Sequence, residues 1–265
     1  MKLNHVKESL HAHRAVVGTE LSRMRSLEVV RIFADAGYEF FFIDLEHTPF
    51  SLETVADMVA VARASEIVPL VRIPDVEYSW VARILDLGAQ GIIVPRIASA
   101  QQVEEVVRWT RYPPLGVRGF ALTRHQTDGV AIDPAHFMEH LHHETLVVIQ
   151  IERKEALDNL EEILRVPGVD VACLGYMDLS VDLGIPGSLD DPRMIQAIER
   201  LIAAGKSTGV ATGIMCNDLS AIQRWVEQGM QFIASSTDGE IFQQAASHAA
   251  ERLRDICHVP RYHRS

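Results

Sequence analysis

Two acidic residues stand directly behind apolar stretches, where they could do chemistry together. Glu152 follows the run at 147–151, and Asp178 follows the run at 171–174 by way of Gly175. If these runs are neighbouring strands, their ends meet. Two carboxylates at one point suit a divalent cation such as Mg²⁺ or Mn²⁺, with Co²⁺ and Zn²⁺ as alternatives. The other explanation is that each carboxylate begins a helix, where the positive helix end favours negative charge.

Further polar residues follow the other apolar runs and extend this candidate site. They are Asp44, Glu46 and His47 at and after 40–44, Arg72 at the end of 68–72, Gln150 before Glu152, and Ser235 at the end of 232–235. A metal at the carboxylates could chelate a 2-oxo acid and stabilise its enolate as a Lewis acid. Arg72 would stabilise the same oxyanion, and His47 would carry a proton near neutral pH. Gln150 could orient the metal site, and Asp86 could orient His47 if the two meet across an interface.

The elements that position these residues alternate along the chain as strands and helices. Predicted strands span residues 15–19, 40–44, 68–72, 91–95, 146–151, 171–174, 210–215 and 232–235. Predicted helices span residues 27–36, 52–64, 80–87, 100–111, 154–164, 192–207, 219–228 and 240–254. Continuous apolar strands are typical of a parallel sheet covered by helices on both faces. The pattern predicts an α/β fold, a (β/α)8 TIM barrel in a single domain over residues 1–265, with a doubly wound sheet as the alternative.

The composition excludes several classes of partner. The chain has 265 residues, is 48% hydrophobic and carries a formal net charge of −11, so nucleic acid and anionic membranes would repel it. Its three cysteines form no zinc-type pattern, and two of them lie within apolar runs, which indicates buried thiols in a reducing compartment. The sequence has no signal core and no apolar stretch of about 18 residues, so we expect a soluble, cytoplasmic protein.

Several motifs, in order along the chain, resemble one known family. They are Ile43-Asp44-Leu45-Glu46-His47-Thr48-Pro49, Val71-Arg72, Leu85-Asp86-Leu87-Gly88-Ala89, Ile93-Val94-Pro95, Arg111-Tyr112-Pro113-Pro114-Leu115-Gly116-Val117-Arg118-Gly119, Gln150-Ile151-Glu152, and Gly175 through Asp178-Leu179-Ser180. Together they resemble the HpcH/HpaI class II pyruvate aldolases, the 4-hydroxy-2-oxoheptanedioate / 2-dehydro-3-deoxyglucarate aldolases. The resemblance runs from about residue 15 to 255, and its collinear motifs are more specific than any single motif.

The resemblance implies a barrel that forms a homo-oligomer, usually a hexamer built as a trimer of dimers, with the C-terminal helix exchanged between partners. The site residues that it implies are Glu152 and Asp178 for the metal, Arg72 for the pyruvyl oxygens, and His47 with Asp86 for the aldol proton. Backbone amides after Gly175, including that of Met177, would hold the pyruvate carboxylate.

The chain departs from the family pattern at three places. The family has Gly-Pro-Ala-Asp-Leu where residues 175–179 read Gly-Tyr-Met-Asp-Leu. The side chain of Met177 is expected to crowd the donor pocket, and Tyr176 could reshape its mouth. The sequence after Gly119, within a long irregular segment at 112–134, also differs, and we expect this loop to influence acceptor specificity. Hydroxyl residues at 235–237 replace a more apolar sequence and could bind a polar acceptor.

We therefore predict a metal-dependent carbon–carbon lyase that reversibly cleaves a 4-hydroxy-2-oxo acid to pyruvate and an aldehyde. The alternatives on the same barrel are an oxaloacetate-type decarboxylase and an acyl-CoA lyase, although no basic cluster for the CoA phosphates is present. A non-enzymatic alternative is a barrel retained for binding or as a scaffold. That alternative predicts a damaged metal pair, whereas Glu152 and Asp178 are both present.

Overall fold

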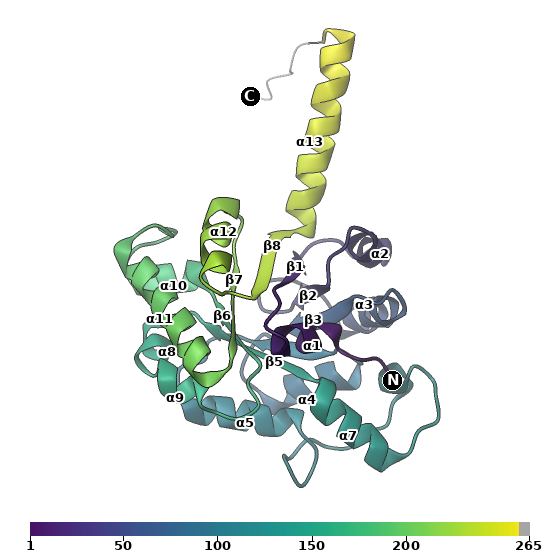
Figure 1. Cartoon of the computed structure of the whole chain (residues 1–265). Coiled ribbons are helices and arrows are strands. Elements are labelled where there is room, and N and C mark those ends of the chain that lie inside the picture. The colour runs from purple at the N-terminus through teal and green to yellow at the C-terminus, as the bar shows by residue number, and fades with distance from the viewer. Residues whose placement is uncertain (260–265) are drawn as a thin grey trace.

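A closed barrel of parallel strands forms the centre of the computed structural model, which describes residues 1–259. The strands follow one another around the barrel in sequence order, and β1 pairs with β8 to close it (Figure 1). They are β1 (Val16–Leu21), β2 (Phe40–Asp44), β3 (Val68–Arg72), β4 (Gly91–Val94), β5 (Leu146–Ile151), β6 (Val171–Leu174), β7 (Ala211–Met215) and β8 (Phe232–Thr237). The predicted TIM barrel is confirmed, and the doubly wound alternative is wrong.

Helices surround this barrel. They are α1 (His5–His11), α2 (Glu28–Asp35), α3 (Leu52–Ala64), α4 (Tyr78–Asp86), α5 (Ala100–Thr110), α6 (Arg124–Thr127), α7 (Pro134–Glu144), α8 (Lys154–Asp158), α9 (Leu160–Leu164), α10 (Tyr176–Asp182), α11 (Pro192–Thr208), α12 (Leu219–Glu227) and α13 (Asp238–Cys257). The single helix expected at 154–164 is wrong, because Asn159 ends α8 and begins α9. Helices α1, α6, α7 and α10 were not among the predicted helices. Within residues 1–259, no helix is long and apolar enough to cross a membrane.

Two apolar cores hold the barrel together. The larger core lies between the strands and the outer helices, and the smaller one fills the barrel interior. Phe40 and Phe232 stack inside the barrel with their ring centroids 4.3 Å apart. The stack requires a glycine at position 18, because a Cβ atom there would lie 2.4 Å from the ring of Phe40.

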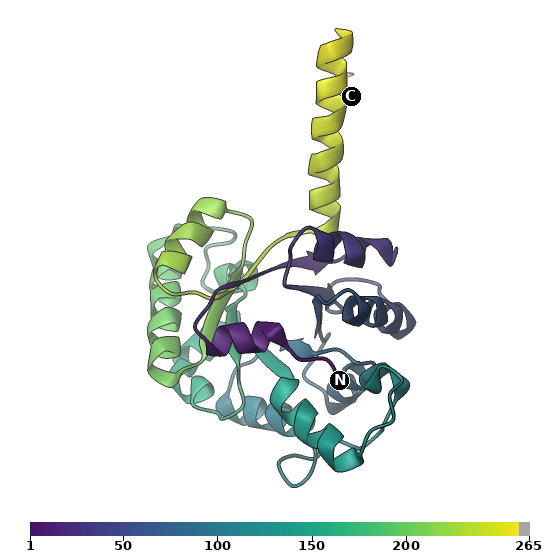
Figure 2. The ribbon, with the colours of Figure 1, turned by 45° about the vertical axis from the view of Figure 1, so that its right-hand side comes forward.

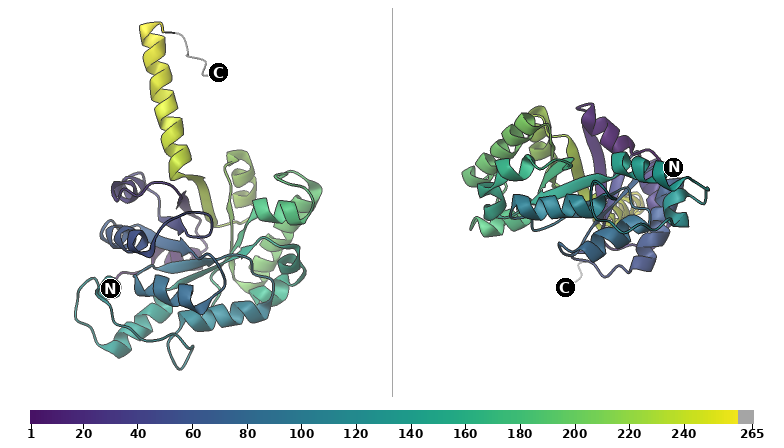
Figure 3. Two further views of the ribbon diagram at one scale, coloured as in Figure 1. Left: turned by 180° about the vertical axis from the view of Figure 1, so that it is seen from behind. Right: turned by 90° about the horizontal axis from the view of Figure 1, so that it is seen from below.

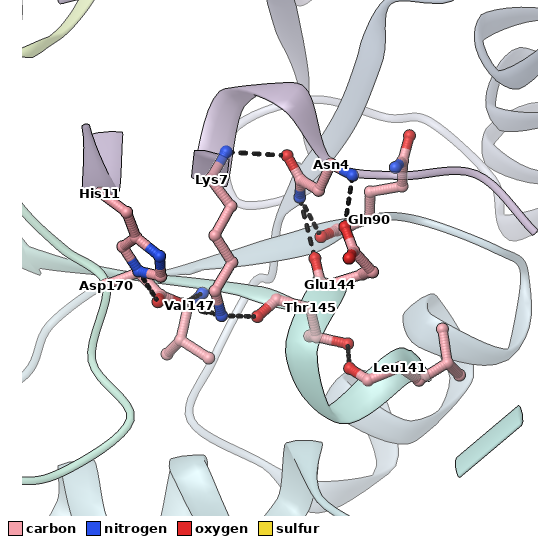
Figure 4. Close-up of polar contacts among 9 residues, drawn as sticks. All are labelled: Asn4, Lys7, His11, Gln90, Leu141, Glu144, Thr145, Val147 and Asp170. Carbon is pink, nitrogen blue, oxygen red and sulfur yellow. Dashed lines mark hydrogen bonds and ion pairs between the residues drawn. The ribbon is translucent and has the colours of Figure 1, made fainter. Parts of the chain in front are cut away.

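Helix α1 closes the end of the barrel where the strands begin. Its apolar residues Val6 and Leu10 belong to the interior core. Lys7 donates to the carbonyl oxygen of Thr145 at 2.8 Å and lies 3.0 Å from a carboxylate oxygen of Asp170, just before β5 and β6 (Figure 4). The side-chain amide of Asn4 donates to two further carbonyl oxygens near strand starts. This end of the barrel is therefore sealed by paired polar groups.

Helix α13 stands away from the barrel instead of covering it (Figures 2 and 3). Its apolar residues Phe242, Leu253 and Ile256 are exposed to solvent. Val17, which points outward from β1, is 47% exposed in consequence. A TIM barrel normally covers its outer surface with the helix that follows each strand, so the last strand and the first lack their usual cover here.

Candidate active site

Glu152 is the buried carboxylate at the centre of the rim where the strands end. It is only 3% exposed, and its Oε1 atom accepts a 2.5 Å hydrogen bond from the backbone amide of Arg96. Burial, with smaller contributions from the charges of Glu46 and Asp178, raises the pKa of Glu152 to about 7. The negative charge at this position is therefore poorly compensated by the protein itself.

The surroundings of Glu152 fit a divalent cation. A Cβ atom at position 175 would lie 2.6 Å from its Oε2 atom, so only glycine at this position lets the carboxylate lie where it does. The Oε1 atom of Gln150 is buried there and has no hydrogen-bond partner within the described chain. Residues 1–259 hold no cluster of three or more His, Cys, Asp or Glu side chains with metal-site geometry. Glu152 and Asp178 would supply two ligands only, which suits Mg²⁺, because this ion keeps several water ligands.

Asp44 organises the neighbouring part of the rim. It is 1% exposed, and its Oδ1 atom accepts a 2.8 Å hydrogen bond from Nε of Arg72. The same carboxylate accepts hydrogen bonds from the backbone amides of Glu46 and His47. Asp44 thus holds the guanidinium of Arg72 and fixes the turn that follows β2. The supporting role predicted for Asp44 agrees with this geometry.

Glu46 connects the Asp44–Arg72 pair to Glu152, the candidate metal ligand. Its Oε1 atom accepts a 3.0 Å hydrogen bond from Nε of Arg96, and its Oε2 atom lies 3.7 Å from Nε of Arg72. Arg96 therefore bonds Glu46 with its side chain and Glu152 with its backbone amide. Arg96 has a left-handed backbone, with φ of 56°, which turns that amide toward Glu152.

His47 and Asp86 do not meet within one chain. The side chain of His47 is 60% exposed and lines a hollow of about 520 Å³ together with Asp44 and Arg72. Asp86, at the end of α4, instead accepts hydrogen bonds from Arg118 at 2.7 Å and from Gln126 at 3.1 Å. The predicted dyad therefore requires a second copy of the chain, as the sequence interpretation already assumed.

The comparisons with known proteins decide the family. The model of the HpcH/HpaI aldolase/citrate lyase family matches residues 23–245. This chain belongs to that family. A 4-hydroxy-2-oxo-heptane-1,7-dioate aldolase of Escherichia coli is 34% identical over 257 residues, which cover 94% of this chain and 95% of the relative. A hydroxypyruvate/pyruvate aldolase of Roseobacter denitrificans is 34% identical over 237 residues, which cover 89% and 91%.

Solved structures agree with this assignment. The crystal structure of an HpcH/HpaI aldolase from Desulfitobacterium hafniense matches with a TM-score of 0.88 and 34% identity, over 94% of this chain and 96% of that one. The resemblance read from the sequence motifs is therefore confirmed at the level of the HpcH/HpaI family.

The residues at which this HpcH/HpaI member departs from the family pattern differ in their surroundings. Met177 is 53% exposed at the start of α10, whereas Tyr176 lines a second, smaller hollow at the rim. Ser235 lines that same hollow. Asp238 is buried and accepts hydrogen bonds from the backbone amides of residues 22–24, so it is a structural link between β8 and the loop after β1.

Part of the irregular segment lies at the opposite end of the barrel. Arg63, in the last turn of α3, pairs with Asp128 at 2.8 Å, and Thr123 bonds the backbone oxygen of Asp86. Gly88, shortly before β4, has the backbone of His125 directly against it. Residues 123–128 are therefore pinned near the strand starts. They do not lie over the rim of their own barrel, and their predicted influence on the acceptor would have to act in another subunit.

Two rim residues were not among the predicted site residues. Arg96 directly follows a predicted strand, so its place at the rim could have been predicted from the sequence. Its backbone hydrogen bond to Glu152 could not, because that contact depends on the fold. Glu20 was missed because the first strand was predicted to stop at residue 19. In the structure β1 continues to Leu21, which places Glu20 inside the rim.

Proposed function

We propose that this chain is a metal-dependent aldolase, a carbon–carbon lyase that reversibly converts a 4-hydroxy-2-oxo acid into pyruvate and an aldehyde. The observation that carries the proposal is the buried Glu152, which accepts a hydrogen bond from one backbone amide and whose pKa is raised to about 7 by burial. The aldolase names of relatives that are 34% identical over nearly the whole chain support the same reaction.

Glu152 and Asp178 would hold the divalent ion, with Gln150 beside them. Mg²⁺ or Mn²⁺ bound there would act as a Lewis acid toward the ketone and carboxylate oxygens of a 2-oxo acid. The chain prepares the site before any ligand arrives, because Arg96 and Gly175 fix the position of the Glu152 carboxylate.

Arg72 would stabilise the charge that develops on the pyruvyl oxygen. Cleavage removes the proton of the C4 hydroxyl, breaks the C3–C4 bond and leaves its electron pair on the pyruvate unit as an enolate, which then takes a proton at C3. The guanidinium of Arg72 is held by Asp44 before the reaction starts, and fixed charges of this kind are the most effective oxyanion stabilisers. His47 lines the same hollow and is the candidate carrier of the C4 hydroxyl proton.

The first turn of α10 would complete the donor site. Amide groups in the first turn of a helix have no acceptor within the helix and can bind a carboxylate. The amides of Tyr176 and Met177, next to Gly175, would then face the pyruvate carboxylate. Met177 would act through its backbone, since its side chain is largely exposed.

We propose further that the protein is a homo-oligomer in which α13 is exchanged between partners. The exposed apolar residues of α13 and the uncovered outer face of β1 at Val17 are the two surfaces that support this proposal. An exchanged helix would cover both. The same proposal includes a hexamer built as a trimer of such dimers. In it, the partner's Asp86 would complete each site. A reducing, cytoplasmic location is consistent with the free state of all three cysteines.

The exchange of pyruvate methyl protons in deuterated water tests the proposed reaction without an aldehyde. Metal-stripped protein should be inactive, and added Mg²⁺ or Mn²⁺ should restore exchange. Glu152→Gln should reduce the exchange rate by more than about a hundredfold, since the ion and the charge beside Arg72 are both affected. Glu155→Gln is a matched control, because Glu155 is exposed on α8. Metal-independent exchange, or full activity of Glu152→Gln, would contradict the proposal.

A further inference from the structure

Glu20 occupies a position at the rim that the proposed reaction has not used. It alternates along β1 with Val16 and Gly18, so its side chain points into the barrel. Its carboxyl group lies in the wall shared by two hollows. The larger hollow, of about 520 Å³, holds Arg72 and His47. The smaller one, of about 170 Å³, lies toward β7 and β8 and contains Ser235.

Most polar groups around the smaller hollow are already engaged. The carboxylate of Glu240 accepts hydrogen bonds from the amide of Thr237 and from the side chain of Asn217. The side-chain oxygen of Asn217 accepts a 2.7 Å hydrogen bond from the amide of Ser236. These contacts fix the wall of the hollow and leave little capacity for a ligand.

Four groups in this wall are free. Across residues 1–259, the hydroxyl groups of Tyr176, Ser235 and Ser236 and the carboxyl group of Glu20 make no hydrogen bond. The charge of Arg72 acts on Glu20 from a distance, and its Nε atom is bonded to Asp44. The hollow therefore offers three hydroxyls and one carboxyl, a set that matches a ligand with hydroxyl groups of its own.

The charges that face Glu20 come from several elements. Burial is the main cause that raises its pKa to about 7, and Asp44, Asp238 and Glu240 also raise it, whereas Arg72 lowers it. Near neutral pH this carboxyl group can both donate and accept hydrogen bonds. As pH rises the carboxyl group of Glu20 loses its proton and becomes an anion. It then repels a ligand that carries a carboxylate of its own.

We propose that Glu20 selects the aldehyde: the smaller hollow receives the hydroxyl-bearing end of a short, uncharged aldehyde, and Glu20 disfavours aldehydes that carry a carboxylate. This inference rests on the proposed aldolase function. The volume agrees with a short acceptor, since about 170 Å³ corresponds to roughly five or six waters at ~30 Å³ each.

The larger hollow offers the competing location. It is lined by Arg23 and Arg25, which are exposed and would attract a carboxylate-bearing aldehyde. If the acceptor bound there, a carboxylated aldehyde would be the better substrate, and these two arginines would carry the preference. The two locations therefore predict opposite selectivities.

Glycolaldehyde and glyoxylate form a matched pair of probes, because both have two carbons and they differ in a hydroxymethyl or a carboxylate group. We would measure kcat/KM for each aldehyde with pyruvate and Mg²⁺, using the full chain at pH 6 and pH 8. The ratio of the two values cancels effects on metal or pyruvate binding, including the titration of Glu152. The parent protein should prefer glycolaldehyde, and its preference should grow between pH 6 and pH 8.

Glu20→Gln keeps the shape of the side chain and removes its charge. It should lower the preference for glycolaldehyde about tenfold at pH 8 and abolish the pH dependence of the ratio. Glu20→Ser is a second variant with the same expected direction, in case the first does not fold. Glu53→Gln, on the exposed side of α3, is the matched control.

The outcomes separate the two proposals. Metal-dependent proton exchange of pyruvate in the parent, together with an unchanged aldehyde ratio in both Glu20 variants, overturns the role of Glu20 alone. A preference for glyoxylate that is lost in Arg23→Ala or Arg25→Ala does the same and locates the acceptor in the larger hollow. Absence of metal-dependent exchange in the parent overturns the aldolase proposal, and the inference on Glu20 with it.

Discussion

The two ends of this barrel both bury charged residues, but they treat them in opposite ways. Where the strands begin, Lys7 donates to Thr145 and pairs with Asp170. Burial alone would raise the pKa of Asp170, yet hydrogen bonds and the charge of Lys7 outweigh it and lower the pKa. Where the strands end, Glu152 is buried with one backbone amide as its donor, Glu20 is half-buried with no hydrogen bond, and burial raises the pKa of each to about 7.

This difference separates stability from function. A buried polar group with all its partners holds the fold, whereas one left without partners costs stability and is retained where a ligand will satisfy it. Each carboxylate is directly adjacent to a buried strand, Asp170 before β6 and Glu152 after β5. The arrangement of partners around each carboxylate makes the distinction.

The largest expected effect comes from breaking the pair at the strand starts. Lys7→Met leaves the buried Asp170 with only the amide of Val147 and the exposed His11 as partners, and we expect the free energy of unfolding to fall by about 3 kcal/mol. Urea denaturation followed by circular dichroism measures this change. The double variant Lys7→Met with Asp170→Asn should recover much of the loss. Lys154→Met, at an exposed position, is the control. The sealing role of α1 would be wrong if Lys7→Met matched this control.

At the rim, the equivalent change should affect catalysis as well as folding, because it also removes the ion-pair partner of the buried Asp44. Arg72→Met removes the charge that Asp44 positions, and we expect kcat for aldol cleavage to fall by about 10²–10³-fold. Arg72→Lys should recover only part of the activity, because lysine lacks the Nε contact with Asp44. Steady-state kinetics with coupled detection of pyruvate provides the measurement. Arg165→Met serves as a control at an exposed position.

The two ends should also respond to pH in opposite directions. Glu152 has a folded-state pKa of about 7 against an ordinary value of 4.5, so its contribution is present below pH 4.5 and is lost as pH rises to 7. A shift of this size corresponds to about 3 kcal/mol. Asp170 has a lowered pKa, so its contribution is present above pH 3.8 and is lost as pH falls below that value.

Metal-free protein should therefore lose stability between pH 5 and pH 7, and Glu152→Gln should remove only part of that loss, because Glu20 titrates over the same range. Thermal melts of both proteins across this range, with and without Mg²⁺, measure the effect. Added Mg²⁺ should raise the Tm of the parent at pH 8 and leave that of Glu152→Gln unchanged. Equal Mg²⁺ responses in the two proteins would place the ion elsewhere.

The sequence determined the barrel with good accuracy where the apolar runs were uninterrupted. The strands β2, β3, β5 and β6 begin and end at the predicted residues, because each is an apolar stretch that is buried along its whole length. The carboxylates that follow β5 and β6 were identified for the same reason. The family followed from motifs along the chain and is confirmed.

Other features depended on contacts between distant residues. Helix α1 is short and weakly patterned, and it is helical because the barrel interior accepts Val6 and Leu10. Helix α10 has seven residues, too few for a clear helical period. Glu20 remained hidden because β1 was predicted one residue short of it, and strand ends are set by pairing with neighbouring strands.

The sequence by itself thus determined the barrel, the family and the positions of the two candidate ligands, since buried strands and the residues that end them are local patterns. Only the tertiary structure decided that Glu152 and Glu20, unlike Asp170, have no ion-pair partner among residues 1–259. It also decided that α13 leaves its own barrel, because its amphipathic pattern does not specify the surface on which it packs. The partners of a carboxylate come from residues far apart in the chain. Whether its charge is compensated is therefore a property of the folded molecule.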